Sequence, residues 1–91
     1  MWSGGVDPSR EKEILDRLKR IEGQVRGIQR MIEERRGCEP VVTQILSAKT
    51  ALERVAAEVV ATSIEECLRE RPPHQAQQEI ARLVRLLSRA G

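Results

Sequence analysis

Apolar side chains recur along the first third of the chain with the spacing of one helix face. They lie four, three, four, three and four residues apart, at Ile14, Leu18, Ile21, Val25, Ile28 and Ile32. This alternation is the 3.5-residue period of helices that pack along a supercoiled seam. Asp7 followed by Pro8 is typical of a helix start, with Asp as the N-cap. The pattern predicts a helix over about residues 8–36, ended by Gly37, and Gly23 and Gly27 indicate a close approach of backbones.

A second seam with the same spacing follows Pro40. Its positions are Val41, Ile45, Ala48, Leu52, Val55 and Val59. A further apolar line widens the stripe, at Val42, Leu46, Ala56, Val60, Ile64, Cys67 and Leu68. We therefore expect a helix over about residues 40–70 that is apolar on more than one side. Such a helix suits contacts both with a helix of its own chain and with another subunit.

The prolines at positions 72 and 73 end the second helix and precede a short third one. Ile80, Leu83, Val84 and Leu87 share one face of that helix, which we expect over about residues 76–89. The turn between the first two helices is short, so these helices must be antiparallel. The predicted fold is all-α: a three-helix protomer whose long hairpin dimerises into a four-helix bundle, with a dimer-of-dimers tetramer as a further step. Residues 1–6 are expected to be a flexible tail, and residues 7–91 a single helical domain.

Composition agrees with a small helical subunit of an oligomer. The 91 residues include one Trp and neither Phe nor Tyr, so the core must be aliphatic. A chain of this size buries a modest share of its surface when it folds alone, which favours oligomerisation. No apolar run is long enough to cross a membrane, and the first residues lack the apolar segment of a signal peptide. We therefore expect a cytoplasmic protein that does not contact membranes.

Basic residues are concentrated in two parts of the chain, although the net charge is only +2. The first half holds Arg10, Lys12, Arg17, Lys19, Arg20, Arg26, Arg30, Arg35 and Arg36, and the end of the chain holds Arg82, Arg85 and Arg89. So many arginines fit either an exposed helix surface or a site for nucleic acid. Composition alone leaves both interpretations open.

The two cysteines lie near opposite ends of the predicted second helix. Cys38 and Cys67 are 29 residues apart, which at about 1.5 Å per residue is roughly 43 Å along a helix. A disulfide needs Cα atoms within about 7 Å, so the two thiols of one chain cannot meet. If two second helices pair antiparallel across a dimer, Cys38 of one subunit lies beside Cys67 of the other. The cysteines are therefore either an inter-subunit pair or unrelated.

The surroundings of the two thiols differ. Cys38 follows Arg35 and Arg36 at a helix N-terminus, and both features favour the thiolate. Cys67 has acidic neighbours at positions 65, 66 and 70 and apolar flanks, so its pKa should not be lowered. This asymmetry suits an attacking thiol and a resolving thiol. The alternative is that both are ordinary small core residues.

With these features assembled, the chain resembles the copper-sensitive operon repressor (CsoR/RcnR) family over about residues 9–88. The resemblance rests on the segment from Arg17 to Ile28 (RLKRIEGQVRGI), on residues 31–34 (MIEE), on Cys38 followed by residues 43–45 (TQI), and on Ala51-Leu52. It implies a disc-like tetramer of three-helix protomers that binds duplex operator DNA without a helix-turn-helix. It also implies that an inducer bound between subunits releases the DNA.

The resemblance further implies which inducer the chain senses. Copper-sensing relatives have Cys, then His 25 residues on, then Cys four residues later; here Cys38 and Cys67 are kept and Ser63 occupies the middle position. A hydroxyl is a poor ligand for soft Cu(I). Two thiols without the histidine are similar to the CstR-like sensors of persulfides and polysulfides, which need no cofactor. The alternative is a Cu(I)-responsive repressor that uses the two thiolates, with His74 as a possible third ligand and an exposed loop residue otherwise.

The resemblance also points to residues for DNA. Arg17 and Arg54 match functionally important arginines of the family, and Lys19, Arg20, Arg26 and Lys49 are supporting candidates for phosphate contacts. Any of them could instead be an exposed solubility charge. A different class, a helical scaffold or a thiol-transfer enzyme, has little support, because there is no CxxC motif, no acid–base constellation and one His.

Overall fold

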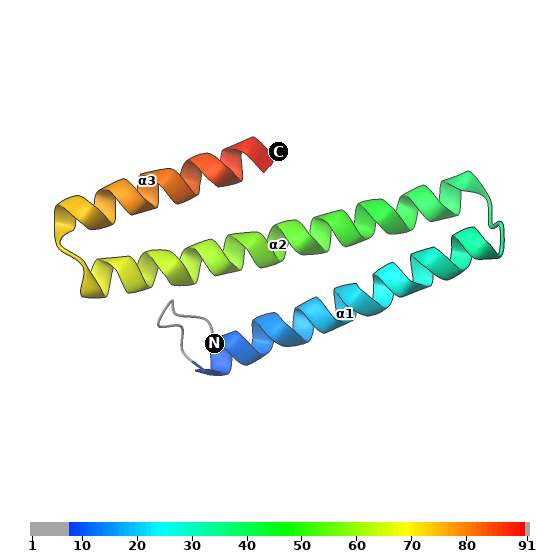
Figure 1. Ribbon diagram of the computed structural model, residues 1–91, viewed down its shortest axis with the longest axis horizontal. Helices are drawn as coiled ribbons and strands as arrows, with labels where there is room; N and C mark the ends of the chain where they lie inside the picture. The colour runs from blue at the N-terminus through cyan, green and yellow to red at the C-terminus, as the bar shows by residue number, and fades with distance from the viewer. Residues whose placement is uncertain (1–7, 91) are drawn as a thin grey trace.

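The computed structural model describes residues 8–90, which form three α-helices. They are α1 (Pro8–Glu33), α2 (Cys38–Glu70) and α3 (Pro73–Ala90). A short turn joins α1 and α2 into an antiparallel hairpin, and α3 folds back along α2 (Figure 1). The predicted all-α protomer is confirmed. The expected tail over residues 1–6 and the N-cap at residue 7 lie outside the described residues.

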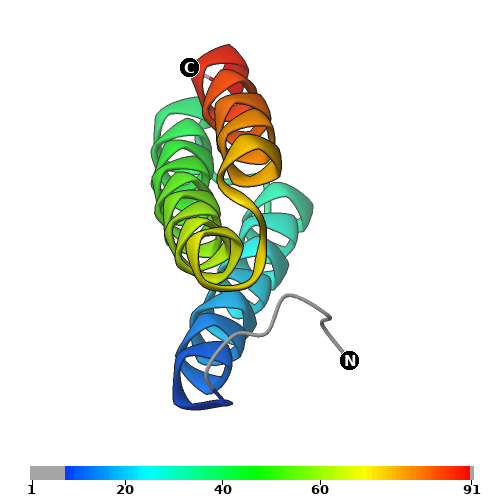
Figure 2. The same cartoon turned by 90° about the vertical axis from the view of Figure 1, so that its left-hand side faces the viewer.

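The three helices lie in a single layer with α2 in the middle. α2 packs against both α1 and α3, whereas α1 and α3 do not pack against each other within the described chain. The protomer measures 54 × 27 × 14 Å, and its narrow dimension is visible along the long axis (Figure 2). An α-helix with side chains is about 10–12 Å across, so the layer is one helix thick.

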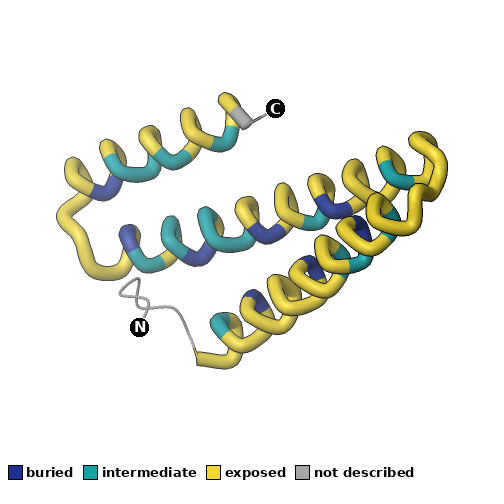
Figure 3. The backbone as a smooth tube through the Cα atoms, turned by 45° about the vertical axis from the view of Figure 1, so that its right-hand side comes forward, coloured by how far each residue is buried: buried dark blue, intermediate teal, exposed yellow. Residues whose placement is uncertain are grey.

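The core of this layer is a narrow line between α1 and α2. On α1 every seventh residue is buried, at Ile14, Ile21 and Ile28. Ile14 and Ile21 pack with Val55 of α2, and Ala51 and Val59 complete the cluster. The buried residues therefore occupy the facing sides of the two helices (Figure 3). The predicted heptad pairing of the hairpin is confirmed. Only about half of the predicted seam positions on each helix are buried in this pairing.

The other half of each seam remains exposed in the protomer. Leu18, Val25 and Ile32 of α1 are exposed, as are Ile45 and Leu52 of α2. Several of these residues line an apolar groove of about 630 Å³ whose wall includes Leu87 of α3. Because domains are ordinarily built from at least two packed layers, this single layer has an unpaired apolar surface.

The end of α1 differs from the sequence-based prediction. α1 ends at Glu33, and Arg35 adopts the left-handed conformation with φ 56°. The Arg36 N–H bonds to the Met31 carbonyl at 3.0 Å and the Arg35 N–H to the Ile32 carbonyl at 3.1 Å, which is a Schellman motif with Arg35 at C′. The prediction that Gly37 ends this helix was wrong. Gly37 has φ −56° and is the N-cap of α2.

Three further expectations are corrected. α2 begins at Cys38 rather than at residue 40, since Pro40 lacks a backbone N–H and is tolerated in a first turn. α3 begins at Pro73 rather than at residue 76, because a proline is also tolerated at the first position of a helix. His74 therefore lies in a helix and not in a loop. A Cβ built on Gly23 or Gly27 would meet no atom within 4 Å in the described structure. The protomer therefore shows no close backbone approach at these glycines.

Candidate thiol and nucleic-acid sites

The two cysteines lie at opposite ends of one continuous helix. Cys38 is the first residue of α2, and Cys67 lies in its last turn. Both thiols are free, Cys38 exposed and Cys67 buried. The uninterrupted helix separates them by roughly 43 Å at about 1.5 Å per residue, so the prediction that they cannot meet within one chain is confirmed.

Cys67 is enclosed where α3 folds back over the end of α2. Its side chain is 3% exposed, and Ala76 of α3 is buried beside this junction. The Glu79 carboxylate of α3 lies close enough to this thiol to affect its pKa. Burial raises the pKa of the Cys67 thiol, the neighbouring Glu79 carboxylate raises it further, and the Arg71 guanidinium opposes them. Cys67 is therefore held as the protonated thiol at neutral pH.

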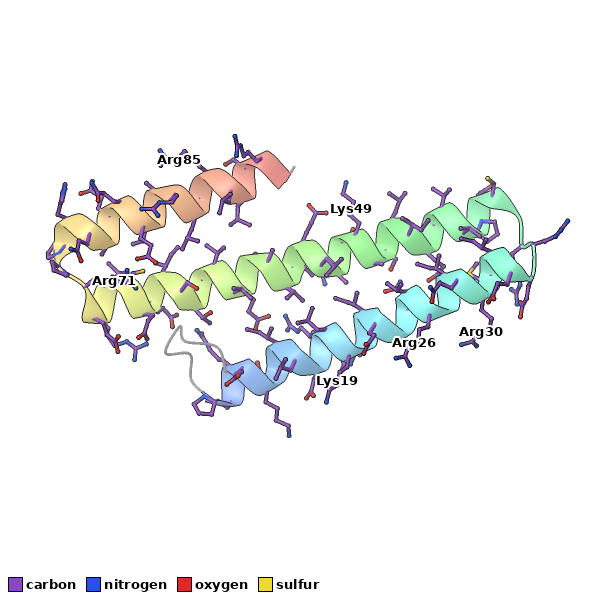
Figure 4. All side chains as sticks on the ribbon, viewed as in Figure 1. Lys19, Arg26, Arg30, Lys49, Arg71 and Arg85 are labelled. Carbon is purple, nitrogen blue, oxygen red and sulfur yellow. The ribbon has the colours of Figure 1, made fainter. Side chains whose placement is uncertain are left out.

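A salt bridge fixes the carboxylate that raises the pKa of Cys67. Arg71 Nη1 lies 2.5 Å from Glu79 Oε2, and the side chain of Arg71 lies between α2 and α3 (Figure 4). The Arg71 N–H also bonds to the Cys67 carbonyl at 3.1 Å and caps α2. Sequence reasoning did not identify Arg71 or Glu79. The sequence suggests neighbours of Cys67 only within α2. Glu79 is an acidic residue near the start of an amphipathic helix that follows two prolines, and its proximity to Cys67 depends on how α3 packs against α2.

The acidic residues expected around Cys67 have other roles. Glu65 Oε2 pairs with Arg10 Nη1 of α1 at 2.8 Å. A hydrogen bond with Glu70, slight burial and the Glu70 charge raise the pKa of the Glu66 carboxyl. Glu66 has a lesser effect on the Cys67 thiol than Glu79 has. The prediction that the pKa of Cys67 is not lowered is confirmed, with Glu79 rather than the α2 acids as its main charged cause.

Few potential metal ligands accompany Cys67. Ser63 is half-buried one turn earlier on the same face of α2. His74 Nε2 lies 3.3 Å from Gln78 Nε2, one turn further along α3. Within residues 8–90, no group of three or more His, Cys, Asp or Glu side chains is arranged to hold a metal ion. The candidate groups for binding a soft metal ion are therefore the two thiols, and a second subunit would have to bring them together.

Three arginines line a cleft between α1 and α2. Arg17 and Arg20 of α1 and Arg54 of α2 surround a cavity of about 670 Å³. Gln24, Ser47 and Thr50 add polar groups to its wall, and Ile21 and Val55 form its apolar floor. Guanidinium groups with hydroxyl and amide neighbours can bind phosphate oxygens. The cleft is thus a candidate contact surface for a phosphate backbone.

The remaining candidates for DNA binding lie elsewhere. Lys19 and Arg26 point from the side of α1 that faces away from α2, whereas Lys49 points from α2 on the side away from α1 (Figure 4). Lys49 lines the apolar groove, and Arg26 pairs with Glu22 at 3.8 Å. The structure therefore brings Arg17, Arg20 and Arg54 together and leaves the other three separate.

Comparison with known proteins identifies the family. Residues 10–89 match the family described as metal-sensitive transcriptional repressors, so the chain belongs to that family and its assignment from sequence is confirmed. This is a family of transcriptional repressors, not of enzymes. None of the described helices is long and apolar enough to cross a membrane.

Individual relatives agree with this assignment. The chain is 44% identical over 61 residues to the copper-sensing transcriptional repressor CsoR of Bacillus subtilis (strain 168), covering 66% of this chain and 60% of that protein. It is 48% identical over 52 residues to the copper-sensing transcriptional repressor RicR of Mycobacterium tuberculosis (strain ATCC 25618 / H37Rv), covering 57% and 54%. These matches thus span less than two thirds of either relative. A solved structure of the nickel-responsive transcriptional regulator InrS superposes with a TM-score of 0.62 at 32% identity, covering 87% of this chain and 85% of that one.

Proposed function

We propose that the chain is a cytoplasmic DNA-binding transcriptional repressor that senses persulfides or polysulfides through an inter-subunit pair of Cys38 and Cys67. Cross-linking of this pair releases the operator DNA. The observation that carries the proposal is the placement of an exposed thiol and a buried thiol at the two ends of one helix. Each thiol requires a second copy of the chain to meet the other.

The single-layer protomer supports such an assembly. The exposed halves of the α1 and α2 seams need a second apolar layer, and another hairpin of the same chain offers the same heptad spacing. Antiparallel packing of two α2 helices would place Cys38 of one subunit near Cys67 of the partner subunit. A dimer would contain two such pairs, and a tetramer four.

The chemistry follows from the different environments of the thiols. The exposed Cys38 thiolate attacks the outer sulfur of a low-molecular-weight persulfide, RSSH; the sulfur–sulfur bond breaks, RSH leaves, and Cys38 becomes a persulfide. The partner's Cys67 then attacks the Cys38 sulfur, forms a disulfide and expels hydrogen sulfide. In sum, RSSH and two thiols give RSH, H₂S and one disulfide, so the donor is reduced by the two electrons that the thiols lose. A second RSSH that first converts Cys67 to a persulfide gives a trisulfide, with a second RSH released.

The basic cleft supports the DNA-binding part of the proposal. Arg17, Arg20 and Arg54 are exposed and share one cavity, so they can neutralise neighbouring phosphates and release counterions. An inter-subunit bridge would change how the hairpins lie relative to one another, and thereby the spacing between the basic clefts of different subunits. Phosphate contacts depend on that spacing.

A Cu(I)-responsive repressor is the second candidate, because two relatives are named copper-sensing repressors. The same two thiolates could hold Cu(I) in a two-coordinate site, since thiolates suit soft ions. The donor set favours sulfur chemistry, because Ser63 occupies the position of the histidine in copper sensors and a hydroxyl is a weak ligand for Cu(I). His74 would have to contribute from α3.

Fluorescence anisotropy tests the proposal with duplex DNA from the region upstream of the chain's own gene. We expect the reduced protein to bind this DNA and anaerobic glutathione persulfide to release it. Cys38→Ser and Cys67→Ser should bind DNA and ignore the persulfide. Release by one equivalent of Cu(I) per thiol pair, with no response to persulfide, would instead establish the copper sensor.

A further inference from the structure

Arg17 is paired with a carboxylate of its own chain, with which a phosphate would have to compete. Its Nη1 contacts Oε2 of Glu58, so a salt bridge joins α1 to α2 at the cleft. The Glu58 side chain is 23% exposed, against 49% for Arg17. Arg20 and Arg54 make no salt bridge with any residue in the described range. Of the three arginines in the cleft, Arg17 alone therefore has a resident counter-ion.

Glu58 lies next to the cleft, although it is not among the residues that line it. It follows Arg54 by four residues on α2, so the two side chains lie on one face of that helix. A phosphate that enters the cleft and contacts Arg17 approaches this carboxylate as well. Like charges repel, and the repulsion is least screened for a partly buried group.

We propose that Glu58 is an internal competitor for Arg17 that lowers the affinity of the cleft for the phosphates of duplex DNA. This inference rests on the proposed DNA-binding function and names a residue that regulates it. A DNA phosphate must displace Glu58 from the guanidinium of Arg17 or share that guanidinium with it. Binding to each protomer therefore releases fewer counterions from the DNA than three unpaired arginines would release. Glu58 acts through Arg17 and does not itself contact DNA.

The test is the variant Glu58→Gln, which removes the charge and keeps the size of the side chain. The hydrogen bond that Thr62 Oγ1 donates to the Glu58 carbonyl involves the backbone and is kept. Glu65→Gln is the matched control, because it removes the other salt bridge between α1 and α2, Arg10–Glu65, and changes the net charge equally. The partner of Glu65, Arg10, does not line the cleft, whereas the partner of Glu58, Arg17, does.

Two polyanions serve as probes: a random-sequence duplex DNA, measured by anisotropy over a range of salt concentrations, and a heparin column. We expect Glu58→Gln to bind the duplex about three- to fivefold more tightly than Glu65→Gln, the range that an exposed ion pair can account for. Its salt dependence should be steeper by about 0.9 in log–log slope for each additional phosphate neutralised. It should also leave heparin at a higher salt concentration than Glu65→Gln.

Arg17→Ala identifies the pathway of the effect. In that background, Glu58→Gln should give no more gain than Glu65→Gln, because the contested guanidinium is gone. Equal affinities of the two single variants, or weaker binding by Glu58→Gln, would overturn the inference; weaker binding would mean that the carboxylate orients Arg17. If the heparin order holds but the protein does not bind its upstream DNA, the competitor is supported and the repressor function is contradicted.

Discussion

The carboxylate of Glu79 on α3 lies near the buried thiol of Cys67 on α2 and raises the pKa of that thiol. The same carboxylate forms a salt bridge with Arg71 in the turn between the two helices. One carboxylate thus connects a candidate sensing thiol to the helix that covers it.

The first prediction concerns the reactivity of Cys67. Because burial and Glu79 raise its pKa, the folded, reduced protein should alkylate more slowly at Cys67 than at Cys38 near pH 7. The rate at Cys67 should increase as the pH rises above the usual range of thiols. Site-resolved mass spectrometry after brief exposure to iodoacetamide measures both rates. Equal rates for the two thiols at neutral pH would contradict the assignment of Cys67 as the resolving residue.

Replacing Glu79 with Gln should speed the alkylation of Cys67. The substitution removes the negative charge that disfavours the thiolate, so the pKa of Cys67 should fall. Glu70→Gln is the matched control on the outer surface of α2, and its effect on Cys67 should be smaller. If both variants alkylate at the wild-type rate, the contact with Glu79 has no part in holding the thiol protonated.

A third prediction separates the cleft from the other basic residues. Arg17→Ala and Arg54→Ala should each weaken DNA binding and reduce the slope of the salt dependence by about 1 for each phosphate that is no longer neutralised. Arg26→Ala removes an equal charge from the outer side of α1 and should have a smaller effect. Anisotropy titrations at three salt concentrations measure both quantities. An equal weakening in all three variants would indicate a diffuse charge effect and not a cleft.

The fourth prediction concerns the unpaired apolar surface. Val25 and Leu52 are 44% and 47% exposed and line the apolar groove. Leu52→Glu should dissociate the oligomer that we propose, because a carboxylate in an apolar interface loses its hydration. Gln78→Glu, on the exposed surface of α3, is the control. Light scattering after size exclusion gives the mass; an oligomer that survives Leu52→Glu would show that this surface is not the interface.

The fifth prediction follows from the left-handed residue at the end of α1. Arg35 has φ 56°, a conformation that costs an L-residue about 1–2 kcal/mol and costs glycine almost nothing. The greater flexibility of glycine in the unfolded chain offsets part of this gain, so Arg35→Gly should raise the free energy of unfolding by about 0.5–1 kcal/mol. Urea denaturation measures it. Destabilisation would mean that the Arg35 side chain makes a contact worth more than the strain.

The sequence was sufficient for the helices and for the α1–α2 pairing, because heptad spacing specifies both. It could not tell which half of a seam the protomer buries, since Ile21 and Val25 are equally apolar and only the crossing of α1 and α2 distinguishes them. The turn was misassigned because Gly37 fits a C′ position by residue type, whereas the chain path requires the left-handed residue two positions earlier. Glu79 was missed because its contact depends on how α3 folds back.

The candidate site was predicted only in part, for a related reason. The separation of Cys38 and Cys67 follows from counting residues along one helix, and the structure agrees. The grouping of Arg17, Arg20 and Arg54 requires the register between α1 and α2, which spacing within one helix does not contain. The same register brings Glu58 to Arg17.

The most direct test of the central claim is intact mass spectrometry under denaturing, non-reducing conditions after anaerobic treatment with glutathione persulfide. Parallel samples receive hydrogen peroxide or Cu(I). We expect covalent dimers linked through Cys38 and Cys67, some heavier than a plain disulfide dimer by one or two sulfur atoms. Monomers without added sulfur, together with tight retention of copper under native conditions, would contradict persulfide sensing and leave a metal-responsive repressor.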